Sequence, residues 1–229
     1  MTLFKYILPV FLSLQIILGN VTGIKFGNII SCIANMLYST DAISTDVKLD
    51  TKILNQRSGS IDAITGCGPT SAAMLLISEK GFDITKDEAV VNAYSKGFYY
   101  YAGYNFTSGL GVTQENIQSL IRDFGFDSEI DHMLYDSSEE IIQKIDSQLN
   151  KGHRLIVGHL ARHGNRFLHY ALIYGRHTKN GETFYNIADP WGGLDSEWSR
   201  DDLLEQINSV YASGPNSFEG MVKGIQWLV

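Results

Sequence analysis

The sequence has 229 residues, of which 44% are hydrophobic, with 22 glycines against 4 prolines and a formal net charge of −7. This length allows one domain with a sizeable core, and the composition is that of an ordinary globular chain. The acidic balance and the absence of a basic run argue against a nucleic-acid-binding protein.

The first 23 residues have the pattern of a secretory signal peptide. Lys5 is followed by an apolar core over residues 6–18 and by small or permissive residues near Gly23. This core is shorter than the ~20 residues that span a bilayer. We therefore expect a secreted or cell-envelope protein, with an uncleaved membrane anchor as the alternative. Residues 24–52 are interpreted as a spacer or propeptide, and residues 53–229 as one domain.

The chain contains two cysteines, Cys32 and Cys67. A disulfide between them is one interpretation, and a free Cys67 is the other. Neither cysteine belongs to a CxxC pair or to a His/Cys cluster with zinc-site spacing. The sequence therefore predicts neither a metal site nor a cofactor.

Cys67 lies in the stretch Gly66–Pro69, directly before a run of helix formers from Thr70 to Lys80. Proline is tolerated in a first helical turn, so Pro69 is compatible with a helix that begins here. The partial positive charge at a helix N-terminus favours the ionised form of a thiol. Glycines on both sides of Cys67 would let a substrate backbone approach the sulfur. The alternative interpretation is a small buried cysteine in an ordinary core helix.

The remaining pattern predicts helices first and strands second, which indicates the α+β class. The predicted helices are Thr85–Lys96, Thr113–Phe124, one within Ser137–Asn150 with Ser138 as its cap, and a short one from Ser199. The predicted strands are Arg154–Leu160, Leu168–Gly175, Glu182–Ala188 and Gly220–Val229. The segment Phe98–Gly111 is rich in aromatic residues and glycine, which predicts a loop, either beside a cleft or packed on the surface.

Two polar residues interrupt the apolar strands: His169 near the start of one and Asp189 at the end of the next. Asn180–Gly181 between them is a strong hairpin signal. The two side chains come opposite each other if the connecting loop is slightly longer than two residues, whereas a strict two-residue turn would pair His169 with Gly192. A core histidine and a turn-forming aspartate are the alternatives.

Cys67, His169 and Asp189 together are typical of a thiol triad. In that chemistry the histidine takes the thiol proton and later protonates the leaving group. The aspartate fixes the imidazole tautomer, and ion pairing keeps the thiolate reactive near neutral pH.

Three motifs resemble those of papain-like cysteine peptidases of the bacteriocin-processing (double-glycine leader) type and their stand-alone relatives. These motifs are Gly66-Cys67-Gly68-Pro69-Thr70-Ser71, Leu168-His169-Tyr170-Ala171-Leu172 and Ala188-Asp189-Pro190-Trp191-Gly192-Gly193. The resemblance covers Ile53 to Gly193. It implies a helical N-terminal lobe that carries the cysteine helix and packs on a C-terminal antiparallel sheet.

The same resemblance implies roles for two further residues. Gln56 matches the glutamine that donates to the oxyanion together with the amide of the nucleophile, and a solvent-facing glutamine is the alternative. Trp191 matches a tryptophan that shields the His–Asp pair.

The sequence therefore predicts a secreted cysteine hydrolase that cleaves peptide or amide bonds through a thioacyl-enzyme. The alternatives are an acyltransferase or transpeptidase with the same triad, and a non-catalytic secreted binding protein on a papain-like scaffold. The expected partner is a peptide or protein substrate, with no nucleic acid and no membrane beyond the signal segment. The sequence shows no P-loop and no further apolar span, so export-coupled leader cleavage is not expected.

Overall fold

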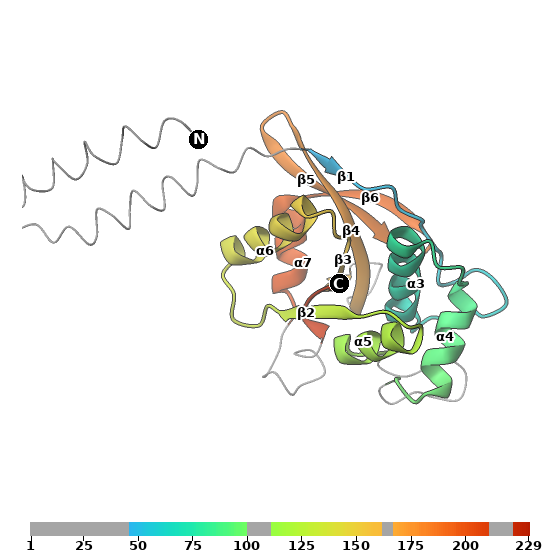
Figure 1. Cartoon of the computed structure of the whole chain (residues 1–229). Coiled ribbons are helices and arrows are strands. Elements are labelled where there is room, and N and C mark those ends of the chain that lie inside the picture. The colour runs from blue at the N-terminus through green and yellow to red at the C-terminus, as the bar shows by residue number, and fades with distance from the viewer. Residues whose placement is uncertain (1–45, 100–110, 162–166, 211–221) are drawn as a thin grey trace, which may run out of the picture. The chain divides into compact units, whose positions relative to one another are not determined.

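The computed structural model describes residues 46–99, 111–161, 167–210 and 222–229 (Figure 1). The described helices are α3 (Cys67–Lys80), α4 (Lys86–Ser95), α5 (Gln114–Asp123), α6 (Ser138–Asn150) and α7 (Arg200–Asn208). The described strands are β1 (Val47–Lys48), β2 (Ser128–His132), β3 (Leu155–Ala161), β4 (Phe167–Lys179), β5 (Glu182–Asp189), β6 (Leu194–Ser199) and β7 (Gly224–Leu228). The predicted signal peptide, Cys32 and most of the aromatic loop lie outside the described residues.

The described strands belong to one antiparallel sheet with the order β2-β7-β3-β4-β5-β6, and β1 pairs separately with β4. Helices precede most of this sheet in the chain, so the predicted α+β class is confirmed. No helix in the described part of the chain is long and apolar enough to cross a bilayer.

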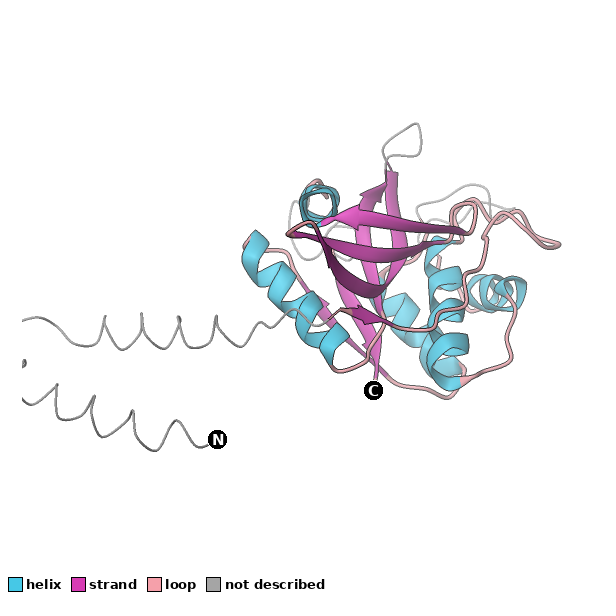
Figure 2. Ribbon diagram, turned by 90° about the horizontal axis from the view of Figure 1, so that it is seen from above, coloured by secondary structure: helices cyan, strands magenta, loops and turns pink. Residues whose placement is uncertain are grey.

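Helices cover both faces of the sheet (Figures 1 and 2). On one face, α3 and α5 pack against Tyr170, Leu172 and Tyr174 of β4. On the other face, α6 and α7 pack against Ala171 and Ile173 of the same strand. Because side chains alternate along a strand, β4 contributes to both cores, which explains its nearly continuous run of buried residues.

The helix boundaries follow their capping residues. Thr85 and Glu88 form the predicted capping box of α4, and Gly81 ends α3 in the left-handed conformation at φ 62°. The predicted cap of α6 was Ser138, but the structure places the cap at Ser137. The hydroxyl of Ser137 accepts from the amide of Glu140, and the carboxylate of Glu140 accepts from the amide of Ser137. These two hydrogen bonds form a second capping box.

The hairpin between β4 and β5 differs from its prediction. Lys179 pairs with Glu182, so the turn contains only Asn180 and Gly181, both with positive φ. The longer loop was therefore a wrong prediction. A β-bulge between Ile173 and Gly175 shifts the register instead, and Leu172 pairs with Ala188.

The sequence did not predict three strands. β2 and β6 form the two edges of the sheet, and β1 precedes the predicted domain boundary. Strand β1 extends as a segment over residues 46–52, which we call the strap. The strap is bound to β4 through Leu49, whose amide donates to the carbonyl of Tyr174 at 2.9 Å.

Candidate active site

Cys67 is the first residue of α3 and is half-buried. It carries a free thiol. The first amides of an α-helix have no intrahelical partner, so the N-terminus of α3 presents N–H groups and partial positive charge beside the sulfur. The structure thus places Cys67 at the start of a helix, where the sequence predicts it.

The glycines beside Cys67 are required by packing. A Cβ atom on Gly66 would lie 2.6 Å from Cβ of Ala63, and one on Gly68 would lie 2.2 Å from Cγ2 of Val112. Both distances are shorter than the 3.0 Å below which non-bonded contacts of a Cβ atom essentially never occur. The start of α3 therefore fits closely against its neighbours, which holds the sulfur in one place.

His169 and Asp189 lie in contact at the adjacent ends of β4 and β5. The ring nitrogen Nε2 of His169 lies 2.7 Å from Oδ1 of Asp189, and the two side chains are nearly inaccessible to solvent. Continuing the register of the hairpin places Asp189 opposite Ala171, so the two side chains meet diagonally on one face of the sheet. The amide of Trp191 also donates to Oδ1 at 2.8 Å, which orients the carboxylate.

The electrostatics connect this pair to Cys67. Burial alone would lower the pKa of His169, but the charge of Cys67 and the hydrogen bonds to Asp189 and Cys67 outweigh burial and raise it to about 9. Burial raises the pKa of Tyr99 and of Tyr170, and the charge of Cys67 raises both further. Cys67 therefore lies close to His169, while the surrounding phenols remain neutral.

Gln56 lies beneath the loop that leads to Cys67 and has no exposed surface. The alternative interpretation of a solvent-facing glutamine is therefore wrong. Its Nε2 donates to the carbonyl of Ala63 at 3.0 Å and to that of Ile64 at 2.8 Å. The role of Gln56 as an oxyanion donor stays a prediction.

The aromatic neighbours of His169 form a connected series. Phe167 lies 5.5 Å from His169 between ring centroids, and Trp191 lies 5.2 Å from Phe167. The guanidinium of Arg57 lies over the Trp191 ring, 5.1 Å from its centroid. Trp191 thus reaches the neighbourhood of His169 through Phe167, and its shielding role stays a prediction.

Sequence reasoning missed a second histidine at this site. His159 pairs with His169 across β3 and β4, is fully buried, and lies 5.3 Å from His169 between ring centroids. On its other side the ring of Trp198 lies at 5.0 Å. The signal that could have found it is the pairing of the two predicted strands, since an antiparallel register can place His159 directly opposite His169.

Within the described ranges, no group of three or more His, Cys, Asp or Glu side chains could hold a metal ion. The chemistry available to the site is that of the thiol, the imidazole and the carboxylate.

Comparisons with known proteins place this chain in a family. The model of the peptidase C39 like family matches residues 48–214, whereas no curated protein matches the sequence. The structure of digestive procathepsin L 3 from the larval midgut of Tenebrio molitor is similar at a TM-score of 0.40 and 10% identity, covering 82% of this chain and 70% of that one. A structure concerning antibody cross-reactivity between the mite allergens Blo t 1 and Der p 1 has a TM-score of 0.39 and 14% identity, covering 82% of this chain and 73% of that one.

The family match begins inside the strap and extends past α7, which is most of the described domain. The predicted resemblance to this group of cysteine peptidases is thereby confirmed. The chain belongs to the peptidase C39 like family, and it is of the cysteine peptidase type.

Proposed function

We propose that this protein is a secreted cysteine hydrolase that cleaves peptide or amide bonds through a thioacyl-enzyme. Cys67 is the nucleophile, His169 is the general base and acid, and Asp189 orients His169. Secretion is proposed from the signal-like pattern of residues 1–23. The substrate is a peptide or protein.

One observation carries the proposal. A buried His–Asp pair, with 2.7 Å between Nε2 and Oδ1, lies beside the only cysteine in the described part of the chain. Because Nε2 is bonded to Asp189, Nδ1 is the ring nitrogen that remains to exchange a proton with the thiol. The raised pKa of His169 keeps the imidazole protonated at neutral pH, which is the state that stabilises a thiolate.

The reaction then proceeds in two halves. The Cys67 thiolate attacks the substrate carbonyl carbon, and the tetrahedral oxyanion receives a hydrogen bond from the amide of Cys67 at the start of α3. The imidazolium of His169 protonates the leaving amine as the C–N bond breaks, which leaves a thioester. His169 next takes a proton from water, the hydroxide attacks the thioester, and the acid leaves as the thiolate is restored.

The test combines labelling with turnover of a small acyl donor. Iodoacetamide at mild pH should alkylate Cys67 at least ~10-fold faster than free cysteine, since the thiolate fraction controls this rate. Peptide mass spectrometry would locate the label. p-Nitrophenyl acetate should acetylate the same sulfur with release of p-nitrophenolate, and Cys67→Ala should abolish both reactions.

Cys32→Ser is the matched control, because it removes the other thiol of the chain and should leave both rates unchanged. If Cys67 reacts no faster than free cysteine and Cys67→Ala retains ester hydrolysis, the proposed function is wrong.

A further inference from the structure

His159 lies directly opposite His169 in the sheet. The register of β3 and β4 pairs the two residues, and their ring centroids lie 5.3 Å apart with the ring planes at 78°. Residues opposite each other on antiparallel strands have Cβ atoms ~4.5–5.5 Å apart, so the strand register itself produces this contact. His159 also has no exposed surface. It is therefore an internal neighbour of His169 that solvent does not reach.

A second aromatic ring holds His159 in place. Trp198 lies 5.0 Å from His159 between ring centroids, with the ring planes at 75°. Trp198 belongs to β6, which is not adjacent to β3 in the sheet, and it packs against the core on the α6 and α7 face. Because protein interiors are close-packed, the ring of His159 cannot turn without displacing Trp198 or His169.

The ring of His169 needs a contact of this kind to keep its orientation. The χ2 torsion of a histidine is broad and roughly two-fold, so the backbone does not determine the ring plane. Asp189 holds one ring atom, Nε2, at 2.7 Å. A single hydrogen bond leaves the ring free to turn about that bond. A flat neighbour that is itself fixed removes this freedom, and His159 is such a neighbour.

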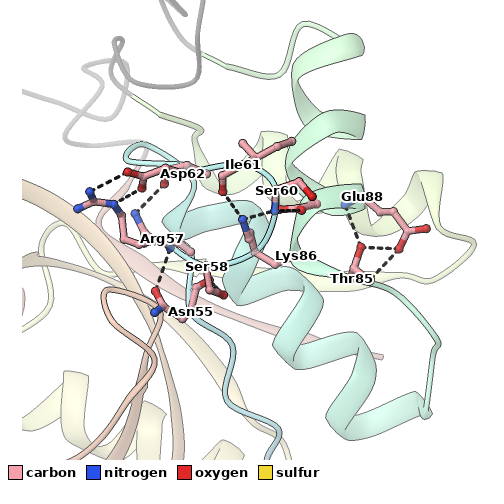
Figure 3. A network of polar contacts seen from close by, with 12 residues as sticks. Asn55, Arg57, Ser58, Ser60, Ile61, Asp62, Thr85, Lys86 and Glu88 are labelled. Carbon is pink, nitrogen blue, oxygen red and sulfur yellow. Dashed lines mark hydrogen bonds and ion pairs between the residues drawn. The ribbon is translucent and has the colours of Figure 1, made fainter.

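Another contact of His169 leads to the surface of the protein. Phe167 and Trp191 follow His169 in the aromatic series, and both are half-buried. The series ends at the exposed side chain of Arg57, which lies over Trp191 and pairs with Asp62, as Figure 3 shows. Since solvent reaches this end, His159 is the more firmly held of the two ring neighbours of His169.

The charge of His169 determines which form of His159 fits beside it. A second positive charge on a buried ring 5.3 Å away would repel the imidazolium and would also be disfavoured by burial. Of the two ring neighbours described for His159, His169 titrates and Trp198 carries no charge. A neutral His159 packs against His169 without competing for its proton.

We propose that His159 is a positioning residue: as a neutral ring held between Trp198 and His169, it fixes the plane of the His169 imidazole so that Nδ1 faces Cys67. This inference rests on the proposed function. Without the ring of His159, the imidazole of His169 turns about its hydrogen bond to Asp189, and its ion pair with the thiolate weakens.

The test compares two variants of the full chain. His159→Ala removes the ring, whereas His159→Phe keeps an aromatic ring and removes its nitrogens. In His159→Ala, alkylation of Cys67 by iodoacetamide at neutral pH should fall about tenfold or more, because small displacements in a reactive pair are costly.

The pKa of His169 is the second quantity to measure in these variants. In His159→Ala the NMR midpoint of its ring protons should fall below about 9, since the charge of Cys67 contributes less to it. His159→Phe should keep most of the alkylation rate and the wild-type midpoint. A loss of stability alone would not move the midpoint in the folded molecules.

His177→Ala is the matched control. His177 also contacts an aromatic ring across two strands, that of Phe184 at 5.7 Å, but this pair lies at the turn end of the hairpin between β4 and β5. This variant should leave the alkylation rate and the His169 midpoint unchanged.

Two results would overturn the proposal. One is a wild-type alkylation rate and His169 midpoint in His159→Ala. The other is a loss in His159→Phe as large as that in His159→Ala, which would show that the nitrogens of His159 are needed. A wild-type Cys67 that reacts no faster than free cysteine would instead remove the proposed function.

A further measurement needs no variant and covers the case in which His159→Ala does not fold. In the wild type at pH 7, the ¹⁵N shifts of the His159 ring should be those of a neutral imidazole, while those of His169 are those of an imidazolium. A charged His159 ring under these conditions would contradict the proposal.

Discussion

At the scale of single residues, the site depends on how a buried titratable ring is paired with groups of opposite charge. His169 is protonated in a place that solvent hardly reaches, which burial alone would oppose. The charges and hydrogen bonds of Cys67 and Asp189 oppose this effect of burial and raise the pKa of His169. The pair is therefore stable as a charged unit, and removing one partner should change the ionisation of the others.

Asp189→Asn should lower the pKa of His169 from about 9, because it removes a negative charge while keeping a hydrogen-bond acceptor. The midpoint of the His169 ring protons in an NMR titration would measure this change. The raised pKa of the wild type means that the pair adds stability that is fully present below pH ~6.5 and is lost as the pH rises through about 9. The stability difference between wild type and Asp189→Asn should follow the same window.

Asp195→Asn is the control for this titration, since it also replaces a hydrogen-bonded carboxylate of the sheet, one that accepts from Tyr174. An unchanged His169 midpoint in Asp189→Asn would show that Asp189 does not set the charge of the ring.

At the scale of elements, the caps decide where the helices begin. Ser137 and Ser138 are neighbours of the same type, yet only Ser137 accepts from the N3 amide of α6. Ser138 contacts Asn208 through an exposed hydrogen bond of 3.2 Å. The pair is therefore a matched comparison within one helix.

Ser137→Ala should lower the free energy of unfolding by ~1 kcal/mol, because it leaves an amide of the first turn without its partner. Ser138→Ala should change it by less than roughly 0.5 kcal/mol, as is usual for an exposed contact. Urea unfolding monitored by circular dichroism would measure both. Equal losses in the two variants would contradict the cap position in the structure.

Much of the fold and of the site could be predicted because the signals were local. The caps at Thr85 and Thr113, the Asn180–Gly181 turn and the cysteine before a helical run each depend on neighbouring residues. The edge strands could not be predicted in this way. Their residues, such as Ser-Glu-Ile-Asp-His in β2, have little apolar alternation, and pairing with β7 is what makes them strands.

The details of the site depended on long-range contacts that leave no sequence pattern. The bulge between Ile173 and Gly175 decides the register that brings His169 beside Asp189. The buried side chain of Gln56 donates to the carbonyls of Ala63 and Ile64, and only the folded loop brings these two groups close to it. The sequence therefore identified which residues to consider and could not establish the contacts of each one.

At the scale of the whole molecule, the strap joins the sheet to α3, the helix that begins at Cys67. Its first residues lie beside β4, where Asp46 accepts from the amide of Thr178 at 3.0 Å. Its last residues lie beside the C-terminal end of α3, where the amide of Lys52 donates to Ser78 at 2.9 Å. The strap thus contacts both the element that carries His169 and the element that carries Cys67.

Arg154 is the main side-chain anchor of the strap. It is buried at the start of β3, donates to Thr51 at 2.9 Å and to the carbonyl of Asp50, and lies 3.9 Å from the carboxylate of Glu79 on α3. Burial raises the pKa of Glu79, although the backbone hydrogen bond from Arg154 and its charge oppose this. Glu79 is therefore a half-buried acid whose charged form Arg154 favours.

Arg154→Met should lower the free energy of unfolding by ~1–3 kcal/mol at pH 7, because it leaves the carbonyl of Asp50 without its side-chain donor and the Glu79 carboxylate without its positive neighbour. The loss should be smaller near pH 4.5. Without Arg154 the pKa of Glu79 rises further above its unfolded value, so the native state binds more protons than the unfolded state in this range and its stability falls as the pH rises. Adding Glu79→Gln to Arg154→Met should remove this pH dependence, since a neutral amide can still accept from the backbone of residue 154. Thermal unfolding of both variants at pH 4.5 and pH 7 would measure the effect, and a loss that is equal at the two pH values would show that Arg154 acts on the strap alone.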